Sequence, residues 1–161
     1  MTYKRYLLAA APAVLLAGCG TGADPEDTLE TVRLTEKAQQ DAIAADDADG
    51  VMRHYEGDTE LVLPGAAPVR GADAIRPAIE ALLANPGLKL DVTPGAGWAA
   101  SSGDLAITSS NIQYTTADAT GAEVTVPVVN QKVWRRASGA TWKIVADHNT
   151  VVPQDAVASA E

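Results

Sequence analysis

The chain has 161 residues, of which 47% are hydrophobic and 20% charged, a composition typical of one globular domain of ordinary size. Phe is absent and aromatic residues make up only 4% of the chain, so Val, Ile, Leu and Ala must fill the core. The formal net charge of −9 repels phosphate groups, which argues against nucleic acid as a partner.

Residues 1–18 have the features of a secretory signal peptide. Lys4 and Arg5 give a basic start, residues 7–17 are apolar, and small residues precede Cys19. The apolar run is too short to span a bilayer, which takes about 20 apolar residues. The sequence Leu-Ala-Gly-Cys that ends at Cys19 resembles the lipobox of bacterial lipoproteins, in which the cysteine becomes a lipidated N-terminus. The alternative is an ordinary secretory signal with an incidental cysteine.

The lipobox resemblance implies a protein of the cell envelope, anchored through acyl chains on Cys19 and facing the periplasm or the exterior. Several acyl chains give stable anchoring where one would be marginal. Because Cys19 is the single cysteine of the chain, no intramolecular disulfide is expected. Residues 19–28, rich in Gly, Pro and acidic side chains, are predicted to form a lipidated tether.

Helical patterns dominate the first half of the remaining chain. Apolar residues recur at three- and four-residue spacing from Leu29 onward, with Thr28 as the predicted N-cap. Asn85, Pro86 and Gly87 end the last helical pattern. The elements predicted here are helices at residues 29–48, 51–55 and 72–84 and a strand at residues 59–63.

The second half of the chain is predicted to form strands. The strongest signal covers residues 124–150, where two runs rich in Val, Ile and Trp are joined by a Gly-containing connection, a pattern typical of a β-hairpin. Helices followed by a run of strands indicate an α+β fold. The other predicted strands are residues 88–93, 98–100 and 105–116, with a glycine-bearing bend at residues 94–97 and a flexible tail at residues 153–161.

Several short stretches, taken in order, resemble the nuclear transport factor 2-like superfamily in its SnoaL-like and ketosteroid-isomerase-like branches. They are residues 49–55, 64–68, 69–76, 133–136 and 142–145. The hairpin is also similar to the association domain of calcium/calmodulin-dependent kinase II. For residues 29–152 the resemblance implies a cystatin-like cone, in which a long N-terminal helix packs in a strongly curved, mostly antiparallel sheet around a central pocket. It also implies a homodimer formed through the sheet.

Strand alternation groups the polar side chains of the hairpin. Asn130 and Lys132 share one face of the first strand, and Asp147 and Asn149 share one face of the second. In the kinase association domain, residues at the places matching Lys132 and Asn149 line the pocket. Lys132 is expected either to bind an anionic ligand or to pair with Asp147. The residues expected to line the pocket are Tyr55, Trp98, Tyr114, Asn130, Lys132, Asp147 and Asn149.

Asp147 and His148 are the candidates for proton transfer. Burial of a carboxylate in an apolar cone would raise its pKa towards the working pH, whereas a neighbouring lysine would lower it. The unperturbed pKa of a histidine suits proton transfer, but His148 shares its strand face with Trp142 and Ile144, which favours a packed or interface position. His54 and His148 form no metal-ligand spacing, so neither a metal nor a cofactor is expected.

Three functions are consistent with these patterns. The first is a membrane-anchored, extracytoplasmic domain that binds a small, largely apolar molecule. The second is an isomerase, lyase or cyclase of the SnoaL or ketosteroid type that uses Asp147 or His148. The third is a non-catalytic dimerisation or association module. The sequence does not decide whether the protein is an enzyme, and it names neither the ligand nor the membrane.

Overall fold

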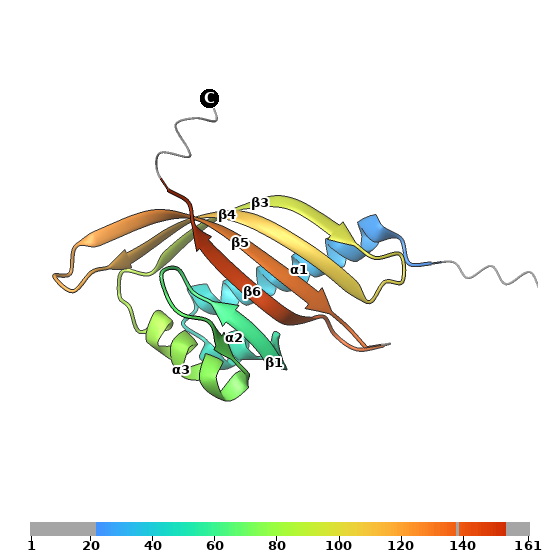
Figure 1. The fold of residues 1–161 in the computed structure, drawn as a ribbon, viewed down its shortest axis with the longest axis horizontal. Helices are drawn as coiled ribbons and strands as arrows, with labels where there is room; N and C mark the ends of the chain where they lie inside the picture. The colour runs from blue at the N-terminus through green and yellow to red at the C-terminus, as the bar shows by residue number, and fades with distance from the viewer. Residues whose placement is uncertain (1–21, 138, 154–161) are drawn as a thin grey trace, which may run out of the picture.

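The computed structural model describes residues 22–137 and 139–153 (Figure 1). The predicted signal peptide, Cys19 and most of the predicted tail lie outside the described residues. Within them, no helix is long and apolar enough to cross a membrane. The elements in chain order are α1 (Pro25–Ala44), α2 (Ala48–Met52), β1 (Tyr55–Val62), β2 (Val69–Arg70), α3 (Ala72–Leu83), β3 (Lys89–Ala99), β4 (Leu105–Ala117), β5 (Glu123–Arg135) and β6 (Lys143–Val151).

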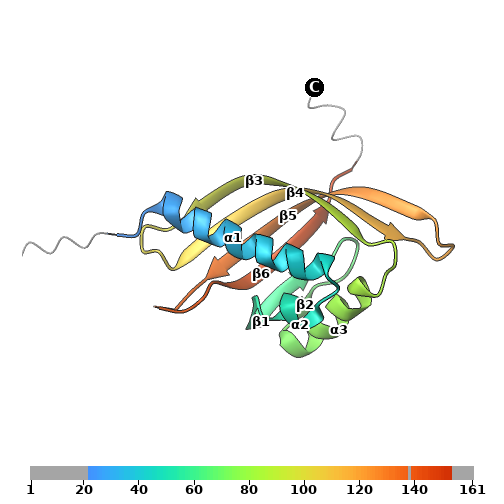
Figure 2. The ribbon, with the colours of Figure 1, turned by 180° about the vertical axis from the view of Figure 1, so that it is seen from behind.

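One six-stranded sheet organises the domain, with strand order β2-β1-β6-β5-β4-β3. Strands β3 to β6 pair antiparallel, and β1 pairs parallel to β6. The sheet is strongly curved, and α1 runs across its inner face (Figure 2). Helices α2 and α3 lie together beyond the C-terminal end of α1, near β1 and β2 (Figure 2). The predicted α+β architecture, a long helix packed in a curved and mostly antiparallel sheet, is therefore confirmed.

Helix α1 begins at Pro25, earlier than the sequence pattern indicates. Asp24 caps it by accepting a 2.8 Å hydrogen bond from the backbone N of Glu26, and Pro25 is suited to the first helical position. Thr28, the predicted cap, is instead buried within the helix. The end of the predicted tether, residues 25–28, therefore forms the first turn of α1.

The inward face of α1 is mostly polar, since three of its four buried residues are polar. Its buried residues are Thr28, Val32, Glu36 and Gln39, which recur at helical spacing. Burying Glu36 and Gln39 is costly unless their polar groups find partners, so this face marks a place where the interior is not a simple apolar core. The apolar core itself is built mainly from aliphatic side chains, with Trp and Tyr in place of the absent Phe: Val32, Val51, Tyr55, Leu61, Ile75, Ile79, Ala99, Ala106, Trp134, Trp142 and Ile144.

Two β-bulges change which side chains face inward. In β6 the register shifts by one residue, so that Val133 pairs with Ala146 but Trp134 pairs with Ile144. Ile144 therefore lies on the inner face with Trp134, and its predicted grouping with His148 is wrong. The bend predicted at residues 94–97 is a second bulge, within a single continuous β3.

Candidate ligand-binding site

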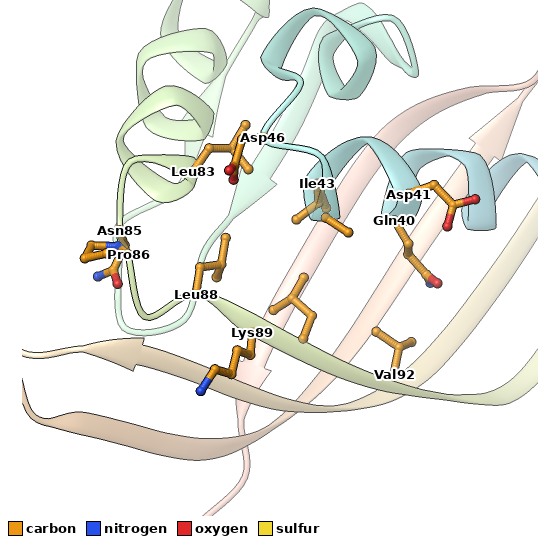
Figure 3. Close-up of a pocket in the computed structure, with 12 residues that line it drawn as sticks. Gln40, Asp41, Ile43, Asp46, Leu83, Asn85, Pro86, Leu88, Lys89 and Val92 are labelled. Atoms are coloured by element: carbon orange, nitrogen blue, oxygen red, sulfur yellow. The ribbon is translucent and has the colours of Figure 1, made fainter.

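Two adjoining hollows lie between α1 and the sheet. The larger, which we call the vestibule, has a volume of about 580 Å³ and lies between the second half of α1, the end of α3 and β3 (Figure 3). The smaller, the inner chamber, has a volume of about 50 Å³ and is surrounded by α1, α3, β1 and β3 to β6. Four residues line both hollows and so form the boundary between them: Gln40, Ile43, Leu90 and Val92.

The two volumes differ in what they can hold. A buried water occupies roughly 10–15 Å³ by this kind of measure, so the inner chamber has room for a few waters or one small chemical group. The vestibule falls within the range of roughly 300–1,000 Å³ that is usual for small-molecule sites. A drug-sized molecule would therefore fit the vestibule alone, and the inner chamber has room only for a small chemical group.

Six of the seven side chains expected to line a pocket lie around the inner chamber, contributed by β1, β4, β5 and β6. They are Tyr55, Tyr114, Asn130, Lys132, Asp147 and Asn149. Cross-strand pairing explains the convergence, because Lys132 lies opposite Asp147 and Asn130 lies opposite Asn149. Strand alternation then directs all four side chains to the same face of the sheet.

Trp98 is the exception, and its predicted place in the pocket is corrected. The bulge in β3 pairs Trp98 with Ile107 instead of with Ala106. Ile107 lies on the outer face, between the buried residues Ala106 and Thr108 of β4. The Trp98 side chain is accordingly 54% exposed and lies outside the inner chamber.

Asp147 is the centre of a buried hydrogen-bond network. Tyr55 donates its hydroxyl to Oδ2 of Asp147 at 2.8 Å, while Asn130 and Asn149 donate Nδ2 to Oδ1 at 2.6 and 3.2 Å. The carboxylate is 4% exposed, so these three donors replace the water that it loses on folding. Both oxygens of Asp147 are thus engaged by the protein.

Tyr55 is held in its protonated form. Burial raises the pKa of the phenol well above 10, and the negative charge and hydrogen bond of Asp147 raise it further. A phenol that keeps its proton remains a donor to the carboxylate at any ordinary pH. The pair is therefore a fixed feature of the chamber wall.

Lys132 does not make the predicted ion pair with Asp147. Its Nζ lies 3.5 Å from Oε1 of Glu36, which reaches across from α1, and Arg33 binds the other oxygen of Glu36 at 2.8 Å. Thr108 also donates to Glu36, at 3.3 Å, and receives the indole N–H of Trp134 at 3.0 Å. The charge of Lys132 is thus compensated by a helix residue, a partner that the pattern of the hairpin could not reveal.

Arg33 also fixes α1 to the sheet. Its guanidinium donates to the carbonyl oxygens of Gly95 and Ala96 at 2.8 and 3.1 Å, within the bulge of β3, and to that of Ser109 at 3.2 Å. A guanidinium has five donors in a rigid plane, which suits several acceptors at once. Arg33 therefore fixes the position of Glu36 through one carboxylate oxygen, while the other oxygen faces Lys132.

Three polar side chains of the chamber wall carry buried atoms that lack a hydrogen-bond partner among the described residues. These atoms are both Oε1 and Nε2 of Gln39, Oγ of Ser110 and Oδ1 of Asn130. The sequence pattern left open which of residues 108–111 face the cavity, and it gave no prediction for Glu36 and Gln39. The available signal was the helical spacing that puts Glu36 and Gln39 on the face of Val32, and the strand alternation that puts Ser110 with Tyr114.

Neither histidine lies in the chamber wall. Nε2 of His148 lies 2.9 Å from Oε1 of Glu60, and its side chain is 44% exposed on the face opposite Asp147. His54 has its pKa lowered by burial and by the positive charges of Lys143, Arg53 and Lys132. Among the described residues, no group of three or more His, Cys, Asp or Glu side chains could hold a metal ion.

The geometry defines a class of protein: a curved sheet closed by one helix around a hollow with a polar floor. Residues 37–146 match the model of the SnoaL-like domain. The chain therefore belongs to the SnoaL-like family. No protein of curated function matches the sequence.

Solved structures share the fold at low sequence identity. A proposed dehydratase of the NTF2-like family from Streptomyces avermitilis is 20% identical with a TM-score of 0.69, over 80% of this chain and 99% of that one. A ketosteroid isomerase-like protein from Erwinia carotovora atroseptica is 18% identical with a TM-score of 0.70, over 79% and 98%. A proposed association domain of calcium/calmodulin-dependent protein kinase type II from Thiobacillus denitrificans is 21% identical with a TM-score of 0.63, over 76% and 96%.

These similarities confirm the expected fold, which other similar structures carry under the name cystatin-like. They also confirm the resemblance to NTF2-like, ketosteroid isomerase-like and kinase association-domain proteins. At such low sequence identity these structures show that the fold is shared but do not indicate a shared reaction, since one fold hosts many activities.

Proposed function

We propose that the domain binds a small molecule whose largely apolar body lies in the vestibule and whose polar end enters the inner chamber. The observation that carries this proposal is the buried polar network around Asp147, which adjoins a vestibule large enough for a ligand. Buried charges and unpartnered polar atoms lower stability relative to apolar packing of the same shape. Their concentration beside a hollow supports a binding role for them.

Apolar side chains form one part of the vestibule wall and support the apolar part of the proposal: Leu83 from α3, Ile43 from α1, and Leu88 and Val92 from the β3 side (Figure 3). The rest of the wall is polar and includes Gln40, Asp41, Asp46, Asn85 and Lys89. Burial of apolar ligand surface against the apolar part of the wall is worth roughly 25 cal/mol per Å² before the costs of binding are subtracted. The polar network at the far end would then fix the orientation of the ligand.

We further propose that this domain is anchored at the cell envelope through acyl chains on Cys19 and faces the periplasm or the exterior. The basic start, the apolar run and the lipobox-like residues 16–19 support this location. Helix α1 begins at Pro25, so the proposed tether between the lipidated cysteine and the domain is short. The ligand would therefore be one that is present outside the cytoplasm.

A second candidate is catalysis, which the buried Tyr55–Asp147 pair favours because it joins a proton donor to a carboxylate. Similar structures described as a dehydratase and as ketosteroid isomerase-like also support it. A base must, however, be free to take a proton from a substrate, and three protein donors already engage Asp147. Binding without reaction is thus the simpler proposal.

Native mass spectrometry of the full chain tests the proposal. The protein is produced with its own signal, extracted in mild detergent and compared with two tryptophan variants. Ile43→Trp places a large side chain at the boundary of the two hollows, whereas Leu34→Trp adds the same group on α1 where Leu34 is 65% exposed. We expect a small retained molecule in the wild type and in Leu34→Trp, and its loss in Ile43→Trp.

The same spectra test the remaining parts of the proposal. Acyl chains on Cys19 add their mass to the mature protein, and the subunit count tests the predicted homodimer. If none of the three proteins retained a small molecule, or if Ile43→Trp retained as much as the wild type, the binding function would be contradicted. An unmodified Cys19 would contradict the anchor but leave the binding proposal standing.

A further inference from the structure

The atoms that lack partners in the inner chamber have a specific chemical character. Gln39 is 1% exposed, and Ser110 and Asn130 are each 2% exposed, so water outside the domain does not reach them. Oε1 of Gln39 and Oδ1 of Asn130 are acceptors, Nε2 of Gln39 is a donor, and the Ser110 hydroxyl can act as either. The wall therefore offers both kinds of hydrogen-bonding group at one place.

The orientation of Asn130 is not arbitrary. Its Nδ2 donates to Oδ1 of Asp147 at 2.6 Å and to Oδ1 of Asn149 at 3.0 Å. Exchanging the amide atoms would set an acceptor against the carboxylate, an arrangement that repels. The free Oδ1 of Asn130 is thus an acceptor by necessity.

The free groups of the chamber suit a charged ligand end of neither sign. A carboxylate is an acceptor only and would leave the free acceptors of Gln39 and Asn130 unpaired. An ammonium is a donor only and would leave Nε2 of Gln39 unpaired. Glu36 already engages Lys132 and three protein donors already engage Asp147, so an added charge in this buried space would lack full compensation, which is costly.

Resting on the proposed function, we propose that the inner chamber selects a neutral ligand end that both donates and accepts hydrogen bonds, such as a primary amide or a hydroxyl. Gln39 is the specificity-determining residue, because its amide presents both complementary groups from α1. Ser110 and Asn130 complete the recognition from β4 and β5. The chamber of about 50 Å³ has room for a group of that size and for no ring system.

Three probes with one aromatic ring and different ends test this selectivity: benzamide, benzoate and benzylamine. Each is titrated against the full-length protein in lipid nanodiscs by ligand-detected NMR, with empty nanodiscs as the blank. We expect benzamide to bind at least about tenfold more tightly than either charged probe, the ratio that one well-made hydrogen bond can give. Binding of benzoate or benzylamine as tight as that of benzamide would overturn the inference.

Matched variants separate recognition from folding. Gln39→Leu removes the free amide at similar volume, and Gln131→Leu makes the same change at an exposed position of β5. We expect Gln39→Leu to weaken benzamide binding about tenfold while its Tm stays equal or rises, because unpartnered buried atoms are removed. A structural role alone would lower Tm and leave the ratio of benzamide to benzoate binding unchanged.

A second variant guards against a misfolded Gln39→Leu protein. Ser110→Ala removes one small hydroxyl and should weaken benzamide binding in the same direction, whereas Gln131→Leu should bind as the wild type does. Unchanged benzamide binding in both Gln39→Leu and Ser110→Ala would overturn this inference but leave the proposed function standing. Binding of none of the three probes to the wild type would overturn the proposed function together with it.

Discussion

Tyr55 and Asp147, 92 residues apart in the chain, are joined by a buried 2.8 Å hydrogen bond from the phenol to the carboxylate. Tyr55 begins β1 and Asp147 lies near the middle of β6, and these two strands pair parallel to each other. The bond therefore connects the start of the first strand of the chain to the last strand. It lies where the apolar core meets the inner chamber.

Tyr55→Phe should lower the free energy of unfolding by about 2 kcal/mol, since a hydrogen bond to a buried charged group is lost while the carboxylate stays buried. Urea denaturation at neutral pH measures this change. Tyr114→Phe is the matched control, because Tyr114 also lines the chamber but is not one of the three side chains that donate to Asp147. Equal effects of the two changes would contradict the role given to the Tyr55–Asp147 bond.

The same variant should alter the stability of the protein at alkaline pH. The pKa of Tyr55 is raised in the folded state, so above pH 10 the unfolded chain loses this proton first and gains stability relative to the folded one. The contribution of the protonated Tyr55 to the free energy of unfolding is therefore fully present below about pH 10 and is lost as the pH rises above it. Denaturation curves between about pH 9 and 11 should show a shallower fall for Tyr55→Phe than for the wild type. Parallel curves would contradict the raised pKa.

Glu36→Gln should be one of the most destabilising single changes at the site. Lys132, 6% exposed, would keep its charge without a counter-charge, and Arg33 would lose its 2.8 Å partner. Breaking a buried ion pair from one side costs about 3–5 kcal/mol. The double variant Glu36→Gln/Lys132→Met should recover a large part of that loss, because it removes the stranded ammonium as well. Additive effects in this double-mutant cycle would show that the two groups do not interact.

Surface ion pairs provide the contrast to Glu36. Lys37 and Asp41 form an exposed pair on the same helix, with nitrogen and oxygen 2.7 Å apart and both side chains about two-thirds exposed. Asp41→Asn should change the unfolding free energy by less than about 0.5 kcal/mol, as is usual for exposed helical pairs. A loss as large as that of Glu36→Gln would remove the distinction between the two sites.

Most of the fold could be predicted from the sequence because its signals are local. The hairpin, the third helix and the α+β order follow from alternation, helical spacing and turn residues, and a bulge fell where the bend was predicted. The inward set Asn130, Lys132 and Asp147 also follows from alternation, since β5 and β6 keep a regular register there. Local periodicity was enough wherever no residue was inserted.

The rest of the site depends on features that periodicity does not record. A one-residue bulge in β3 turned Trp98 outward, and another in β6 turned Ile144 inward. Glu36 and Gln39 were not predicted to line the pocket, since a polar residue on an amphipathic helix usually faces water. Only the packing of α1 against the chamber shows that these two complete a polar interior.

The turn between α3 and β3 is the last element that we expect to be sensitive, because it shapes the rim of the vestibule. Gly87 is buried there, and a Cβ at this position would lie 2.7 Å from the backbone N of Ala117. Asn85 binds the same strand end, donating to the carbonyl of Ala117 at 3.1 Å and accepting from its N–H at 3.0 Å. Gly87→Ala would therefore force apart two backbone segments that Asn85 holds together.

We expect Gly87→Ala to lower the unfolding free energy by about 1–3 kcal/mol, the usual cost of overpacking, and to weaken ligand retention by displacing the start of β3. Gly57→Ala is the control, because a Cβ there has no atom within 4 Å. Urea denaturation and native mass spectrometry on the same preparations measure both effects. A Gly87→Ala protein as stable as Gly57→Ala would mean that β3 and β4 can separate at this end without cost, and the rim of the vestibule would then not be a fixed surface.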